Sequence, residues 1–134
     1  MEQNVTITVR GGDAGYTVRG SMAGGADGAV LLRYEEPAEL GMGGVSTELT
    51  LSADRAVLRR TGAVRCELRF EAGEAHSSVY ETAHGSFPAT VETHFLRVRF
   101  GARGGALEAR YTLTLGGAAD ERRLKLLART EEKA

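Results

Sequence analysis

Apolar side chains recur at every second position through most of this chain. The clearest run is residues 64–70, where Val64, Cys66, Leu68 and Phe70 alternate with charged side chains. A period of two places successive side chains on opposite faces of a strand, so that one face can be buried while the other meets water. Similar runs fill the chain between short turns, and the 18 glycines against two prolines suit tight turns. The pattern predicts about eight to ten antiparallel strands without a βαβ unit.

The length limits how these strands can be arranged. A chain of 134 residues is long enough for one domain with one core, so we expect residues 1–134 to form a single unit. A sheet closed into a barrel leaves no unpaired edge strands. We therefore expect an all-β fold with one antiparallel barrel.

Two segments depart from simple alternation. The apolar phase changes between Phe95 and Leu96, which predicts a bend or bulge within one long strand. The connection Pro37–Gly44 is the longest in the first half and could contain a short helical turn near Ala38–Leu40.

The final segment, Glu121–Arg129, is ambiguous. Asp120 could cap a helix in which Leu124 and Leu127 share a face. A strand with Leu124, Leu126 and Ala128 on one face fits equally well. Residue patterns alone leave both structures open.

Charge and targeting signals narrow the environment. The 17 basic and 18 acidic side chains give a net charge of -1, which argues against nucleic acid and anionic membranes as main partners. The chain begins without the basic and apolar regions of a signal peptide, and it has no apolar run of about 18 residues. Cys66 is the single cysteine and cannot form an internal disulfide. These features predict a cytoplasmic protein.

Several polar side chains fall on faces predicted to point inward. A small barrel can hold one small molecule, and a few convergent polar groups among apolar ones suit an amphipathic ligand. Arg60 would bind its carboxylate or phosphate group. The alternative is a filled barrel, in which Glu36 neutralises Arg60 and the other polar groups complete the network. The candidate ligand-binding residues are Tyr34, Glu36, Arg60, Tyr80, Thr82 and Tyr111.

An enzyme is the weaker hypothesis. His76, Ser78, Tyr80, Thr82 and His84 share one strand phase, which could gather a base and hydroxyls. Neighbouring residues on one strand face lie about 6.6 Å apart, too far for a base to activate a nucleophile. The sequence also lacks familiar catalytic, phosphate-binding and metal-binding motifs, so we predict no catalytic residues, metal or cofactor.

An interaction module or homo-oligomer is the third hypothesis. The chain has 15 arginines but only two lysines, and arginine is enriched at protein interfaces. An apolar outer patch could come from Val79, Leu127 and the segment Leu40–Met42. A basic patch could come from Arg97, Arg99, Arg103, Arg122 and Arg123, although interleaved glutamates and few aromatic residues argue against nucleic acid.

Three short motifs suggest a known family. They are Tyr34-Glu35-Glu36, the segment Arg60–Val64 and Tyr80-Glu81-Thr82 followed by Gly85. In this order they resemble the YwiB-like family, also called the domain of unknown function 1934. The resemblance implies a calycin-like, lipocalin-like antiparallel barrel of a bacterial cytoplasmic protein, with the final segment as a strand. It implies no established activity, and function therefore stays open.

Overall fold

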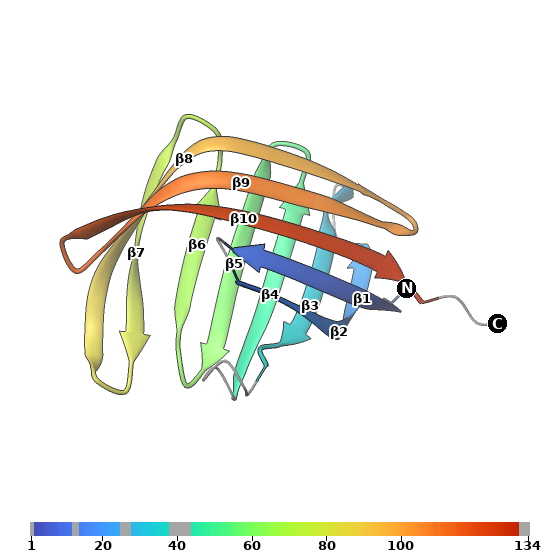
Figure 1. The fold of residues 1–134 in the computed structure, drawn as a ribbon, viewed down its shortest axis with the longest axis horizontal. Coiled ribbons are helices and arrows are strands. Elements are labelled where there is room, and N and C mark those ends of the chain that lie inside the picture. Colours follow the sequence, from blue (N-terminus) through green and yellow to red (C-terminus); the bar gives the residue numbers. More distant parts are fainter. Residues whose placement is uncertain (1, 12–13, 25–27, 38–43, 132–134) are drawn as a thin grey trace.

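The residues that the structure describes form ten antiparallel strands (Figure 1). The computed structural model describes residues 2–11, 14–24, 28–37 and 44–131, and no α-helix occurs among them. The predicted helical turn near Ala38–Leu40 lies outside these residues. The strands are β1 (Glu2–Gly11), β2 (Ala14–Gly24), β3 (Val30–Glu35), β4 (Val45–Ser52), β5 (Arg55–Gly62), β6 (Cys66–Phe70), β7 (Ala75–Thr82), β8 (Gly85–Gly101), β9 (Gly104–Leu115) and β10 (Ala118–Thr130).

The strands form one sheet in the order β6-β5-β4-β3-β2-β1-β10-β9-β8-β7. In Figure 1, β1, β8, β9 and β10 cross steeply over β3 to β6. The two ends of this order, β6 and β7, meet at a bridge between Arg65 and Glu81. The Arg65 amide donates to the Glu81 carbonyl at 2.9 Å, and the Glu81 amide donates back at 2.8 Å. The prediction of an antiparallel, lipocalin-like barrel is confirmed.

The final segment is a strand. β10 pairs with β1 on one side and with β9 on the other. Leu126 and Ala128 are 1% and 5% exposed, whereas Leu127 between them is 60% exposed. The backbone of β10 forms hydrogen bonds with both neighbouring strands, which a helix at this position could not do, and its side chains alternate between the core and the outside.

The change of phase in β8 is a bulge. The register with β9 shifts between Thr93 and Phe95, so the predicted irregularity is confirmed one to two residues earlier. Thr93 is buried, and Leu96 resumes the inward face opposite Ala109. A phase change after Phe95 would place its side chain inward with Val91 and Thr93, but Phe95 pairs with the exposed Arg110 on the outer face. The register change at His94 is the reason.

Large apolar side chains fill the middle of the barrel. Those less than 2% exposed include Ile7, Leu32, Leu49, Leu51, Phe70, Leu107 and Leu126. They come from both crossing layers and form one core. Among the described residues, no helix is long and apolar enough to cross a membrane.

Candidate functional site

Several inward-facing polar side chains gather at one end of the barrel, which we call the mouth, whereas the buried Thr93 accepts from the Glu71 amide at 3.2 Å near the other end. The turns between β5 and β6, between β7 and β8 and between β9 and β10 lie at this end. At the end of β5, Gly62 has a φ of 113°, and a side chain there would collide with the backbone of Gly44. This close approach fixes β5 against the start of β4 and thereby places Arg60 beside Thr47.

Glu36 lies at the centre of the polar group. It follows β3, and its amide donates to the Val45 carbonyl at 2.9 Å. Its side chain is only 3% exposed. The Thr47 hydroxyl donates to Oε1 at 2.6 Å, and the Tyr16 hydroxyl donates to Oε2 at 2.8 Å. Each carboxylate oxygen therefore has a good donor without Arg60.

Arg60 is held close to this carboxylate but is not hydrogen-bonded to it through Nε. The Nε atom lies 3.6 Å from Glu36 Oε1, beyond the usual hydrogen-bond distance. Nε is buried and has no acceptor among the described residues. Burial disfavours the guanidinium charge, but Glu36 and weaker neighbouring groups more than offset it and raise the pKa of Arg60. The side chain is 24% exposed, so a cation with spare donors reaches the mouth.

Tyr16, Tyr34 and Cys66, which lie around Arg60, all have raised pKa values. Burial, together with the Glu36 charge, raises the pKa of Tyr34 to about 12. Burial and the neighbouring Tyr34 and Glu36 raise the pKa of Tyr16 as well. Burial also raises the pKa of the Cys66 thiol, although the Arg60 charge opposes the shift. The mouth thus offers phenol and thiol groups with one carboxylate and one guanidinium.

The structure brings together only some of the candidate residues. Tyr34, Glu36 and Arg60 lie together as described above. Tyr80 lies on the inward face of β7, half-buried against the core, and the Tyr111 ring meets the edge of Phe70 at a centroid distance of 4.8 Å. Burial raises the pKa of Tyr111.

Thr82 is placed differently. Its hydroxyl donates to the Gly85 carbonyl at 3.1 Å and accepts from the His84 amide at 3.1 Å. These bonds stabilise the turn between β7 and β8, and they occupy the hydroxyl that the sequence had assigned to the polar network.

Sequence reasoning missed Tyr16 and Thr47, the two donors to Glu36. Tyr16 has the same strand phase as Val18 and Met22, so extending that inward face by two residues would have found it. Thr47 shares the strand phase of Val45 and Leu49, so alternation places it on an inward face but does not identify the partner of its hydroxyl.

The histidine-bearing strand offers no comparable arrangement. His76 Nε2 lies 3.2 Å from Glu71 Oε1, at the opposite end of β7 from the mouth. His84 lies in the turn after β7. Within the described ranges, no group of three or more histidine, cysteine or acidic side chains could hold a metal ion.

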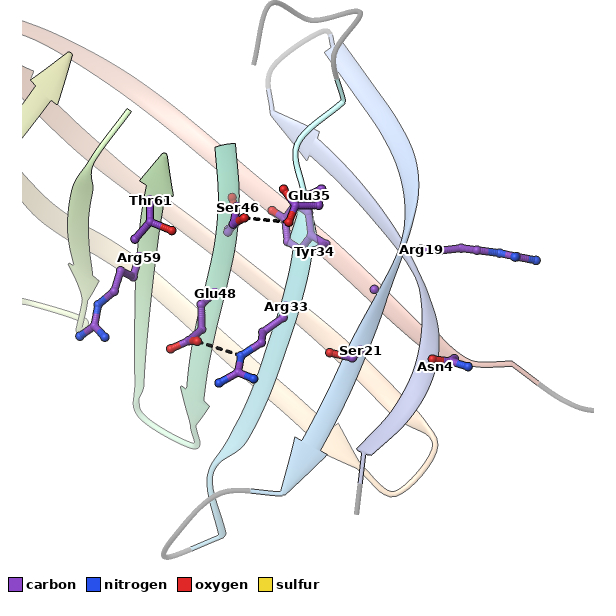
Figure 2. Close-up of a pocket in the computed structure, with 12 residues that line it drawn as sticks. Asn4, Arg19, Ser21, Arg33, Tyr34, Glu35, Ser46, Glu48, Arg59 and Thr61 are labelled. Atoms are coloured by element: carbon purple, nitrogen blue, oxygen red, sulfur yellow. Dashed lines mark hydrogen bonds and ion pairs between the residues drawn. The ribbon is translucent and has the colours of Figure 1, made fainter. Parts of the chain in front are cut away.

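A separate depression of about 690 Å³ lies on the outer face of β2 to β5 (Figure 2). Arg33 donates to Glu48 there at 2.9 Å, and Ser46 donates to Glu35 at 2.7 Å. Arg59, which also lines it, pairs with Glu67 at 2.8 Å. Its charged groups therefore already have partners, in contrast to Arg60 Nε.

Comparisons with known proteins bear on the fold. The family model described as Domain of unknown function (DUF1934) matches residues 3–126. The crystal structure of the ywiB protein from Bacillus subtilis is similar, with a TM-score of 0.84 and 19% identity over 98% of this chain and 94% of that chain. No curated protein matches. At this identity the structural likeness concerns the barrel alone.

Proposed function

Because this chain belongs to the DUF1934 family, a domain of unknown function, we propose a function from its own side chains. The barrel binds a small amphipathic anion at its mouth, with the anionic group on Arg60. The observation that carries this proposal is the mismatch between Glu36, whose two oxygens already accept hydrogen bonds, and Arg60, whose buried Nε has no acceptor within the described part of the chain.

The charge and donors of Arg60 suit a carboxylate or a phosphate. Guanidinium groups bind such anions through two parallel hydrogen bonds, and such charge-assisted bonds are stronger than neutral ones. Glu36 offsets the charge of Arg60 from 3.6 Å without forming a hydrogen bond to Nε. An incoming anion would supply the missing acceptor.

Apolar side chains at the same end would contact the rest of the ligand. Tyr80 and Phe87 are opposite each other in the ladder between β7 and β8. Phe87 is 39% exposed although it has the inward phase of the buried Ala89. Tyr16 and Leu124 are also half-buried against the core. Since the middle of the barrel is filled, the ligand would lie at the mouth and not along the whole axis.

The test measures binding of decanoate by calorimetry, with decanol as the neutral control. Removing the cation with R60Q should weaken decanoate binding about tenfold or more and leave decanol unaffected. E36Q should instead strengthen decanoate binding, because it removes the competing negative charge. Circular dichroism establishes that both variants are folded.

The two variants are expected to change decanoate affinity in opposite directions, and this distinguishes a binding role of the mouth from a structural one. If both variants weakened binding equally, the mouth would be a structural network and the proposal would be wrong. Decanoate binding unchanged in folded R60Q would also overturn it. The double variant E36Q/R60Q has neither charge, so it should bind decanoate more tightly than R60Q, which keeps the Glu36 carboxylate, but more weakly than E36Q.

A second candidate function is a structural or protein-interaction module. The filled interior and the hydrogen bonds of Tyr16 and Thr47 to Glu36 favour it. Native mass spectrometry of protein purified from its own host distinguishes the two. A small molecule that is present in the native spectrum and lost on denaturation supports ligand binding. A native complex that contains a protein partner or a second copy, but no small molecule, supports the interaction module.

We also propose that the protein works in a reducing bacterial cytoplasm. Cys66 supports this location because it is buried and free. Labelling of intact cells with a thiol reagent, before and after permeabilisation and unfolding, should show Cys66 reduced and protected in the cell.

A further inference from the structure

One outer face of the barrel carries a concentration of positive charge, which we call the basic face. It extends over β8, β9, β10, β1 and β2, which are hydrogen-bonded neighbours in this order. Its cations are all exposed: Arg10, Arg19, Arg97, Arg99, Arg110, Arg123, Lys125 and Arg129. Two carboxylates, Glu108 and Glu131, lie among them, and Glu92 and Glu121 border the face opposite Thr112.

This face differs from the patch expected from sequence. Arg97, Arg99 and Arg123 belong to it as predicted. Arg103 lies in the turn between β8 and β9, and Arg122 pairs with Asp120 at 3.0 Å beside the mouth. The other cations come from β1, β2, β9 and the rest of β10, which only the fold brings together.

Like charges face each other directly on this surface. Arg110 is opposite Arg123 in the ladder between β9 and β10, and Lys125 is opposite Arg10 in the ladder between β10 and β1. Directly opposed like charges destabilise a sheet. Among the described residues, Arg19 is the one cation of this face with an ion pair within 4 Å, to Glu131 at 3.2 Å. Glu108 stands opposite both Arg97 and Lys125 and offsets part of this repulsion, but the pair Arg110 and Arg123 has no carboxylate opposite it in these ladders. The remaining like-charge pairs cost stability, and a polyanionic partner would relieve that cost.

The chemistry of the neighbouring groups favours a phosphate backbone. Threonines stand between the cations, with Thr6 opposite both Arg19 and Arg129, and Thr8 opposite Thr17. Arginine, lysine and threonine are the side chains that commonly contact nucleic-acid phosphates. Arg97 and Arg110 also lie over the Phe95 ring, at 5.4 Å and 5.0 Å from its centroid, and arginine and aromatic side chains are the groups on which nucleic-acid bases stack.

Other polyanions fit less well. A membrane-binding face needs several apolar side chains to insert, and Leu127 is the large exposed one here. A stable interface with an acidic protein needs a cluster of apolar anchors, whereas among the described residues of this face Leu127 and the half-buried Phe95 lie on different strands, β10 and β8. The cations are spread over a curved surface of five hydrogen-bonded strands, and a flexible single strand can bend along such a surface more closely than a stiff duplex.

We propose that the basic face binds the sugar–phosphate backbone of single-stranded nucleic acid. The net charge of -1 argued against such a partner, but it averages over a molecule whose charges are unevenly distributed. This site lies on the outside of the barrel and is independent of the anion site at the mouth.

Fluorescence anisotropy with labelled oligo(dT) and oligo(U) of about 20 nucleotides tests the proposal. If about four phosphates are contacted, raising the salt from about 50 to about 200 mM should lower the affinity about 50-fold. A duplex of the same length, vesicles containing phosphatidylserine and polyglutamate serve as competing polyanions. The single strand should bind most tightly.

Two double variants of equal charge change locate the site. R10E/R123E replaces one arginine of each like-charge pair by glutamate, so each pair then joins a positive and a negative charge. We expect Tm to rise by about 2–5 °C and oligonucleotide binding to weaken about tenfold or more. R55E/R69E makes the same charge change on the other layer, where the ion pairs are long at 3.8 and 3.9 Å. It should change binding less than about threefold.

The proposal fails if the two double variants weaken binding equally, because net charge alone would then explain the effect. It also fails if no oligonucleotide binds at low salt, or if duplex, vesicles or polyglutamate compete better than the single strand. R60Q should leave oligonucleotide binding unchanged, so failure here and failure of the mouth proposal are distinguishable.

Discussion

The middle and the mouth of the barrel are lined by the same inward phase of the same strands, yet their chemistry differs. Moving two residues along β4 changes Leu49 to Thr47, and moving two residues along β5 changes Leu58 to Arg60. All four side chains lie on the inward face, but the first of each pair packs into the core and the second joins the polar group. Alternation thus determines which side chains point inward, while position along the strand determines what they can do.

The largest expected effect is in the middle of the barrel. Phe70→Ala should lower the free energy of unfolding by about 3–5 kcal/mol, because Phe70 is fully buried and its removal leaves a cavity. Urea unfolding followed by circular dichroism measures the loss. Leu127→Ala, at a 60% exposed position, is the control and should cost less than about 0.5 kcal/mol. Similar losses in both variants would contradict the filled interior.

The mouth should respond differently to single and double substitutions. Glu36→Ala should lower the free energy of unfolding by about 3 kcal/mol, since it leaves Arg60 without its partner and Tyr16 and Thr47 without their acceptor. The double variant Glu36→Leu/Arg60→Leu should recover most of this loss, because a buried pair can often be replaced by apolar groups. A double variant less stable than Glu36→Ala would show that the pair itself stabilises the mouth.

Alkaline pH should act on the mouth before the middle. The folded pKa of Tyr34, about 12, exceeds the unfolded value of 10.0, so the native state retains a proton that the unfolded state releases. This contribution is complete below about pH 10 and is lost as the pH rises to about 12, amounting to about 2–3 kcal/mol. Urea unfolding between these pH values measures it. Tyr34→Phe should make the decline shallower, and an unchanged slope would contradict the assignment.

The smallest effect should come from Thr82, which lies at the level of the mouth but outside its polar group. Thr82→Val should lower the free energy of unfolding by about 0.5–1 kcal/mol through the loss of its turn hydrogen bonds. Decanoate affinity, measured by calorimetry, should stay unchanged. A marked loss of affinity would place Thr82 in the anion site.

The parts that sequence could predict are those governed by local alternation. The strands, the bulge in β8 and the inward placement of Arg60 follow from the phase of apolar residues. The outward orientation of Phe95 was not predicted, because the register changes at His94, one step before the apolar pattern changes phase. The hydrogen bond from Tyr16 to Glu36 was not predicted, because β2 pairs with β3 only from Gly20 onward and this contact therefore lies outside any ladder.

The full extent of the basic face could not be predicted from the sequence for a different reason. Its cations are distributed over five strands, and their proximity depends on the pairing of β1 with β10, which are far apart in sequence. On the other layer, Arg33, Glu48, Arg59 and Glu67 alternate in sign across four neighbouring strands. The net charge sums over both faces, so it cannot show that positive and negative charges are balanced on one face and that positive charges are in excess on the other.

The closure between β6 and β7 has a consequence for motion. Every other neighbouring pair of strands shares a ladder, whereas these two meet at the bridge between Arg65 and Glu81. Amide hydrogen exchange should therefore be fastest along this seam, since few hydrogen bonds must break for it to open locally. The bridge lies beside Cys66 and the mouth, so such an opening would widen the entrance on the side of Arg60 while the ladders around the core stay intact.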